Sequence, residues 1–133
     1  MSRTSQKLSE KDALMDRRKL GSWGEEQAAR YLRRRGYTIL DMNYLCRCGE
    51  IDIVAKKRKF VVFVEVKLRK NNTFAEAREF VTRAKQERII STAGLWLMEN
   101  ETELQPRFDV IEIYAPEGEN GKINIQHIEN AFQ

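Results

Sequence analysis

The chain has 133 residues, of which 41% are hydrophobic and 33% charged, and its formal net charge is +4. This length suits a single domain with a substantial core. No segment approaches the ~20 apolar residues of a membrane span, and the charged N-terminus is unlike a signal peptide. We therefore expect a cytoplasmic protein with no membrane partner. The charge is uneven, with 22 basic and 12 acidic side chains in residues 1–97 against 2 and 8 in residues 98–133, and this basic excess predicts a polyanionic partner such as nucleic acid.

The N-terminal part of the chain divides into a tail and a helix. Residues 1–18 are charged and polar with few large apolar side chains, which predicts a mobile tail. A helix is expected over residues 22–35, ended by Gly36. Glu25 lies three positions after Ser22, the spacing of a capping box, and it also begins the apolar stripe of the helix. Glu25 is therefore either a capping group or a functional carboxylate.

A first strand is expected over residues 37–44, followed by a tight connection that carries Cys46 and Cys48. With His127, the only histidine, these cysteines lack the four-ligand spacing of a zinc site. A disulfide across so short a gap is not expected. We therefore interpret both cysteines as reduced thiols and His127 as a surface residue.

A hairpin is the clearest pattern in the chain. Two runs of β-branched and aromatic residues, 49–55 and 60–67, flank a short basic break and predict adjacent antiparallel strands. We expect a turn of four residues or a looser one, because the break contains no Gly or Asn, the residues that two-residue hairpin turns favour. The side chains of the break could contact nucleic acid outside a catalytic centre or merely solvate an edge; they are Lys56, Lys57, Arg58 and Lys59.

The even length of the break sets which residues of the hairpin face one another. Asp52 lies opposite Glu65 and Glu50 opposite Lys67, with Cβ atoms ~5 Å apart in each pair. The second run is apolar on both faces apart from Glu65, as in a central strand that is covered on both sides. A carboxylate in such a place takes up a proton unless a cation or a lysine keeps it charged.

These side chains can be explained in two ways. Asp52 and Glu65 can share a Mg²⁺ or Mn²⁺ ion through oxygen ligands, with Lys67 orienting a water or stabilising charge on a phosphate. The alternative is an ion-pair lattice on a solvated sheet face, whose pairs contribute little to stability. The apolar neighbours of Glu65 favour the metal site.

The longest helix is expected from Phe74 to Met98, after a polar loop over residues 70–73 that supplies helix-start signals. Its expected buried stripe consists of Val81, Ala84, Ile89, Ala93, Trp96 and Leu97. Lys85 lies beside that stripe, where it either contacts a substrate or lays its aliphatic stem along the packed face.

Two further strands are expected, over residues 107–114 and 123–128, on either side of a turn. Asp109, in the first of them, lies outside the hairpin patch, and we expect it to anchor structure near the end of the sheet. The order of helix, three strands, helix and two strands predicts an α/β sandwich over residues 19–133, with a mixed sheet of about five strands and helices on its faces.

Several motifs occur together in an order that is typical of one family. They are Gly24-Glu25, Asn43-Tyr44, residues 49–52, residues 63–67 with Arg69, and residues 107–110. This set, over roughly residues 20–114, resembles the small bacterial YraN family, which is related to archaeal Holliday-junction resolvases within the restriction-endonuclease-like nucleases.

The resemblance implies a catalytic set and a metal ion. Asp52 and Glu65 would bind Mg²⁺ or Mn²⁺, and Lys67 would position the attacking water. Glu25 matches a glutamate that reaches the metal site from the first helix, and Lys85 matches a lysine found in relatives. The candidate substrate contacts are Arg69, Lys85 and the four basic residues of the hairpin break.

The predicted function is metal-dependent hydrolysis of phosphodiester bonds in DNA by an endonuclease. Analogy with the resolvases suggests branched DNA as the substrate and a homodimer as the assembly. The competing prediction is a non-catalytic nucleic-acid-binding or adaptor module on the same fold, in which the charged patch is an ion-pair network. Dependence on a divalent metal ion would separate the two.

Overall fold

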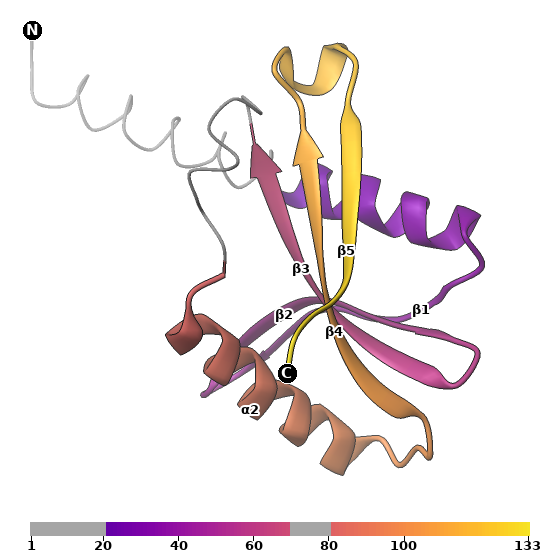
Figure 1. Cartoon of the computed structure of the whole chain (residues 1–133), viewed down its shortest axis with the longest axis vertical. Coiled ribbons are helices and arrows are strands. Elements are labelled where there is room, and N and C mark those ends of the chain that lie inside the picture. The colour runs from indigo at the N-terminus through magenta and orange to yellow at the C-terminus, as the bar shows by residue number, and fades with distance from the viewer. Residues whose placement is uncertain (1–20, 70–80) are drawn as a thin grey trace, which may run out of the picture.

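A five-stranded mixed sheet forms the centre of the molecule (Figure 1). The computed structural model describes residues 21–69 and 81–133. The strands, in spatial order, are β1 (Thr38–Cys46), β2 (Gly49–Lys57), β3 (Phe60–Arg69), β4 (Gln105–Tyr114) and β5 (Asn124–Phe132). β3 and β4 are parallel, and the other neighbours are antiparallel. The predicted α/β fold with a mixed sheet is confirmed, whereas the predicted tail over residues 1–18 and loop over residues 70–73 lie outside the described residues.

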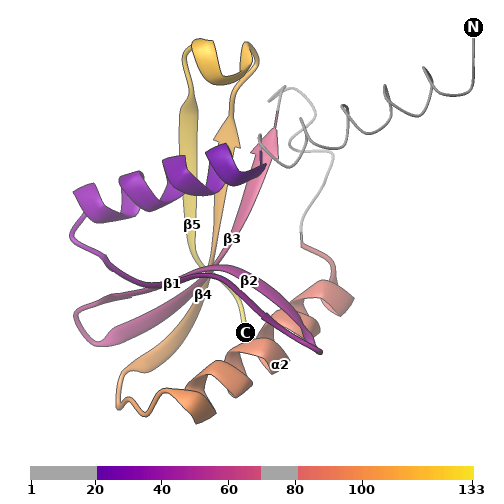
Figure 2. The same cartoon turned by 180° about the vertical axis from the view of Figure 1, so that it is seen from behind.

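Two helices cover the two faces of the sheet (Figures 1 and 2). The helix over residues 21–34 lies on one face and α2 (Arg83–Glu99) on the other. β3 contributes to both cores, because Val62 packs on the side of the first helix and Phe63 on the side of α2. A strand buried on both faces has no need of polar alternation, which explains its apolar sequence. No helix among the described residues is long and apolar enough to span a membrane.

The first helix ends as predicted but begins earlier. Gly36 has a φ of +90°, and Tyr37 N donates to Leu32 O at 3.0 Å, the Schellman arrangement that glycine permits at a helix end. The start differs from the prediction, because the helix already includes Ser22. Ser22 therefore does not cap this helix, the capping-box explanation of Glu25 is wrong, and Glu25 needs another role.

The turn between β2 and β3 is shorter than predicted. Lys57 pairs with Phe60, so the loop consists of Arg58 and Lys59 alone. Arg58 has a φ of +55°, a left-handed conformation that costs a non-glycine residue roughly 1–2 kcal/mol. The prediction of four or more residues is therefore wrong, because strand pairing and the burial of one face of each strand outweigh this local cost.

α2 begins later than predicted. Thr82 caps the helix, and its Oγ1 accepts from Lys85 N at 3.2 Å, while Val81 is buried ahead of the helix. The predicted continuous helix from Phe74 to Met98 is wrong, since residues 81 and 82 are not helical, and residues 74–80 lie outside the described residues. The residues that supplied the start signal lie outside the described part of the chain.

The buried face of α2 matches the predicted stripe in part. Its buried members are Ile89, Ala93 and Trp96. Leu97 is half-buried, whereas Ala84, in the first turn after the cap, is exposed. Thr92 is fully buried although the apolar pattern did not include it; its hydroxyl donates to the Arg88 carbonyl at 2.7 Å, so its burial leaves no unsatisfied donor.

Asp109 anchors β4, as predicted. Its carboxylate is fully buried and accepts from Arg107 Nη2 at 2.8 Å, and His127 Nε2 lies 2.7 Å from Asp109 Oδ2. We call Arg107, Asp109 and His127 the Asp109 cluster. The predicted surface position of His127 is wrong, because its side chain is 5% exposed. The rings of Tyr31 and Tyr37 cover it; their centroids lie 5.6 and 6.1 Å from that of the His127 ring.

Candidate functional site

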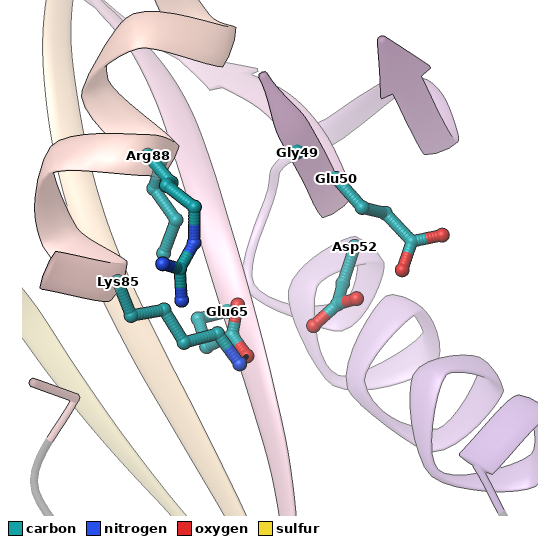
Figure 3. A pocket seen from close by; sticks show the side chains of 7 residues that line it. Gly49, Glu50, Asp52, Glu65, Lys85 and Arg88 are labelled. Carbon is teal, nitrogen blue, oxygen red and sulfur yellow. Dashed lines mark ion pairs between the residues drawn. The ribbon is translucent and has the colours of Figure 1, made fainter. Parts of the chain in front are cut away.

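A pocket opens where β2 and β3 separate, beneath the first turns of α2 (Figure 3). Its volume is about 130 Å³, and it is lined by Gly49, Glu50, Asp52, Glu65, Lys85, Arg88 and Ile89. Figure 3 shows the carboxylates of Glu50 and Asp52 on one side, with Lys85 and Arg88 reaching toward Glu65 on the other. The predicted hairpin patch is therefore part of a concave site between two elements.

The separation of β2 from β3 depends on Asp52. The pairing of the two strands has the predicted register up to Ile53 and Val64. One residue further, Asp52 Oδ2 accepts a hydrogen bond from Val66 N at 2.8 Å. A side chain thus replaces a backbone carbonyl of β2, and the two strands are free to diverge around the pocket.

The predicted pairing of Glu50 with Lys67 is not seen. The backbone ladder between β2 and β3 ends at Ile53 and Val64, before it reaches Glu50. On its other side, Glu50 pairs with Leu45 of β1. Glu50 instead acts on Asp52, whose pKa it raises through charge repulsion. The predicted register therefore holds from the turn up to Ile53 and Val64, whereas Asp52 with Glu65 and Glu50 with Lys67 are not pairs of the backbone ladder.

Four carboxylates act on one another at this site, and we call Glu25, Glu50, Asp52 and Glu65 the carboxylate cluster. Burial raises the pKa of Asp52, with further increases from the charges of Glu65, Glu25 and Glu50, to about 8. The hydrogen bond from Val66 N acts in the opposite direction and does not offset them. Among the described residues, no cation lies within ion-pair distance of Asp52.

Glu25 joins this cluster from the first helix. Burial raises the pKa of Glu25, and the charges of Glu50 and Glu65 raise it further, while hydrogen bonds with Asn43 and Asp52 lower it. Close packing of the helix on β3 brings Glu25 there: a Cβ on the preceding residue, Gly24, would lie 3.8 Å from the Leu68 side chain. Of the two interpretations of Glu25 from sequence, the capping role fails and the carboxylate does reach the hairpin patch.

Two lysines converge on Glu65. Lys85 Nζ lies 2.8 Å from Glu65 Oε1 and Lys67 Nζ lies 3.9 Å from the same atom. Burial lowers the pKa of Lys67, and the neighbouring Lys85 charge lowers it further. Burial also acts to lower the pKa of Lys85, but its hydrogen bond to Glu65, the charges of Glu65 and Asp52 and its contact with Lys67 together outweigh burial and raise the pKa. In the described part of the chain, every ion pair of the carboxylate cluster involves Glu65.

Gly49 seats the β1–β2 turn against α2. Its φ is +155°, and a Cβ there would lie 3.3 Å from Thr92 Oγ1 and 3.7 Å from Arg88 Cβ. This contact is tighter than a side chain accepts without movement, so glycine allows the turn to approach the helix. The approach carries Glu50 and Asp52 toward Lys85 and Arg88.

Sequence reasoning missed two lining residues, Arg88 and Ile89. A signal was present, because Lys85, Arg88 and Thr92 recur at spacings of three and four, which place them on one side of a helix. Thr92 contacts the Gly49 turn and Lys85 contacts Glu65. The position between them therefore faces the same pocket.

The other predicted substrate contacts lie outside the pocket. Arg69 Nε bonds to Glu112 Oε2 of β4 at 2.8 Å, with both side chains largely buried. Lys56 to Lys59 lie at the opposite end of β2 from Asp52. Neither set lines the pocket, and their contact with a substrate stays a prediction.

The carboxylate cluster suits a hard cation without being a preformed metal site. Among the described residues, no three His, Cys, Asp or Glu side chains gather closely enough to hold a metal ion. Mg²⁺, however, commonly takes only one or two protein carboxylates and keeps several of its waters. Asp52 and Glu65 supply such oxygen ligands, and the cavity of about 130 Å³ has room for several waters at ~30 Å³ each. The residues present therefore fit the predicted ion.

Comparison with known proteins gives one family. The family described as "Uncharacterised protein family UPF0102" matches residues 24–113. UPF0102 protein VP0448 of Vibrio parahaemolyticus is 42% identical over 121 residues, covering 90% of this chain and 96% of the relative. UPF0102 protein TTE1452 of Caldanaerobacter subterraneus is 40% identical over 119 residues, covering 89% and 98%. A UPF0102 protein of Syntrophomonas wolfei is 44% identical over 121 residues, covering 86% and 98%. These names state no activity, and the matched segment includes the whole carboxylate cluster.

Proposed function

The chain belongs to the UPF0102 family, the YraN-like family that its motifs indicated, and we propose that it is a metal-dependent endonuclease that hydrolyses phosphodiester bonds in DNA. One observation carries the proposal. Asp52 and Glu65 meet where β2 and β3 separate, and Lys67 follows Glu65 on the same strand. The resemblance to restriction-endonuclease-like nucleases assigns the same three positions to metal binding and catalysis.

The charge of the site supports a cation as its missing partner. Four carboxylates act on one another, while the ion pairs seen in the described residues involve Glu65 alone. The raised pKa of Asp52, about 8, means that ionising it without a partner is unfavourable. A divalent cation shared by Asp52 and Glu65 would remove that penalty, and a large part of its binding energy would come from relieving this repulsion.

The chain's own residues then have distinct roles. When bound, the metal ion supplies a Lewis acid that stabilises negative charge on the phosphate in its transition state. Lys67 orients the attacking water or stabilises charge on the phosphate, and its lowered pKa eases the loss of a proton. Glu25 hydrogen-bonds to Asp52 and holds that carboxylate in place. Lys85, which now pairs with Glu65, would be available to contact a substrate phosphate if Glu65 held a cation.

A cleavage assay tests this function. Wild type, Lys67→Ala and Asp52→Asn, purified identically, are incubated with Mn²⁺ or Mg²⁺ and with three-way, four-way, flap and linear DNA, and the products are resolved on gels. Lys67→Ala should cut about 100-fold more slowly than wild type, the usual scale for one positioned catalytic group. The branched substrates are included because of the resemblance to junction resolvases. If wild type cuts no better than Asp52→Asn on every substrate, the nuclease proposal fails.

A second candidate is a non-catalytic nucleic-acid-binding or adaptor module. It is favoured by the ion pair of 2.8 Å between Lys85 and Glu65, which already compensates one of the two proposed metal ligands. In that case, DNA binding should persist in EDTA, and neither cleavage nor stability should respond to divalent ions. The metal titration described in the Discussion separates the two candidates.

A further inference from the structure

Two basic segments far apart in the sequence meet at one edge of the molecule. The first is residues 33–35, at the end of the first helix, and the second is residues 56–59, at the β2–β3 turn. Figures 1 and 2 show the end of the helix and the hairpin turn at the same edge of the molecule. A Cβ on Gly36 would lie 3.6 Å from Lys57 Cε, and Lys57 Nζ lies 5.0 Å from the Tyr37 ring centroid. We call the two segments together the basic patch.

The basic patch gathers seven cations without visible compensation. Its members are Arg33, Arg34, Arg35, Lys56, Lys57, Arg58 and Lys59. All except Lys57 are exposed, and no carboxylate of the described residues lies within ion-pair distance of any of them. Cations at a helix C-terminus are favoured by the helix dipole, which can account for the arginines. It does not account for the turn, where Arg58 keeps a left-handed backbone.

The basic patch lies at a defined separation from the carboxylate cluster. The first helix runs from Glu25 to Arg34, about 14 Å at ~1.5 Å per residue. From Asp52 along β2 to Arg58, the first residue of the turn, the chain spans about 20 Å at ~3.3 Å per residue. Two elements therefore connect the same two regions. In duplex DNA these lengths correspond to about four to six base pairs, at ~3.4 Å each.

The composition of the patch favours a phosphate backbone over exposed bases. Proteins that hold single strands stack the bases on aromatic side chains. Here the neighbouring rings are already covered, since Arg35 lies 4.6 Å from the Tyr31 centroid and Lys59 lies 5.4 Å from that of Phe60. Among the described residues, none of the exposed large hydrophobic side chains is aromatic. A duplex is also stiff over this length. Its phosphates can therefore lie at a second site without the loss of conformational entropy that ordering a flexible single strand would require.

We propose that the basic patch is a second, non-catalytic binding site for the phosphate backbone of a DNA duplex arm, about four to six base pairs from the phosphate at the carboxylate cluster. The inference rests on the proposed nuclease function and narrows it to substrates that are double-stranded on that side of the cleaved bond. The patch then sets the register of the DNA, while the pocket carries out the reaction.

Salt-dependent binding tests the patch. Affinity for a linear duplex is measured in EDTA, from about 50 to 200 mM salt, for wild type, Arg34→Gln, Arg58→Gln and the double variant. Each lost phosphate contact should make the slope of log K against log salt shallower by ~0.9, so the double variant should lose about two units. Lys122→Gln is the control, because Lys122 is exposed, lies outside the patch and removes the same charge. All variants are first checked for wild-type thermal stability.

Cleavage of shortened arms gives a second test. With wild type, kcat/KM should fall several-fold when the duplex arm is cut from about twelve to about three base pairs, because the shorter arm no longer reaches the patch. The double variant should be insensitive to the same change. If wild type cleaves DNA while the patch variants and Lys122→Gln have equal salt slopes, the patch proposal is overturned and the nuclease proposal stands. If wild type neither binds nor cleaves any DNA, both fall.

Discussion

Two aspartates of this protein, Asp109, which is buried, and Asp52, which is half-buried, have opposite electrostatic surroundings. Asp109 in β4 is fully buried; burial acts to raise its pKa, but hydrogen bonds from His127, Arg107 and Asn130 N lower it below the usual value. Asp52 in β2 meets one backbone N–H and three carboxylates, and its pKa is raised to about 8. The Asp109 cluster is complete without a ligand. In the carboxylate cluster, the ion pairs among the described residues involve Glu65 alone, and a folded protein tolerates such an excess of negative charge where function requires it.

The largest expected effect on stability comes from removing the charge of Asp109. Asp109→Asn removes the charge that compensates Arg107 in a buried place, so we expect it to lower the free energy of unfolding by about 3 kcal/mol. Chemical denaturation followed by circular dichroism measures this. Asp52→Asn is the matched control, because the same chemical change there removes repulsion and should leave stability unchanged or higher. Equal losses in both variants would contradict the contrast between the two aspartates.

The next effect concerns metal binding. Mg²⁺ or Mn²⁺ at about 100 times its Kd should stabilise the wild type by about 2.7 kcal/mol, because an ion that binds only the folded state shifts unfolding by mass action. The rise in Tm should be absent in Asp52→Asn, which has lost one of the two proposed ligands. A similar rise in both proteins would show that the ion binds elsewhere.

A comparable effect is expected from pH in the absence of metal. The pKa of Asp52 is raised from the model-compound value of 3.8 to about 8 in the folded protein, so between these values the folded state holds a proton that the unfolded state has lost. This contribution to stability is complete below pH 3.8 and is lost as pH rises through about 8, by at most ~1.4 kcal/mol per pH unit.

Denaturation at several pH values in EDTA checks this dependence. Between about pH 6 and 8, wild type should lose stability relative to Asp52→Asn. Asp109 should add no loss in that range, because its lowered pKa makes its contribution present at neutral pH and lost only in acid. A flat difference between wild type and Asp52→Asn would mean that Asp52 is ionised and already compensated.

The smallest effect is expected at Lys85. Lys85→Met should cost the metal-free protein less than about 1 kcal/mol, because the pair with Glu65 is partly exposed and Lys67 remains nearby. The same substitution should strengthen metal binding, since the ion no longer competes with an ammonium for Glu65. Isothermal titration with Mg²⁺ or Mn²⁺ measures this. Weaker metal binding would instead identify Lys85 as a group that holds Glu65 in position.

The β2–β3 hairpin and α2 show which local features could be predicted from the sequence. Slipping a strand by one residue turns every buried side chain outward, so the pairing of Ile53 with Val64 was implicit in the apolar pattern. The two-residue turn was not, because Arg58 alone disfavours it and only the paired strands impose it. The start of α2 was also missed, since the Thr82 cap works together with the burial of Val81 against residues distant in sequence.

The sequence by itself determined the composition of the site: Asp52, Glu65 and Lys67 lie on one hairpin, and alternation brings the two carboxylates together. The tertiary structure alone decided which charges are compensated. Lys85 and Glu25 come from separate helices, and His127 reaches Asp109 from another strand. The interaction of two charges depends on their distance and on their exposure to water, and for residues on different elements both are set only when those elements pack.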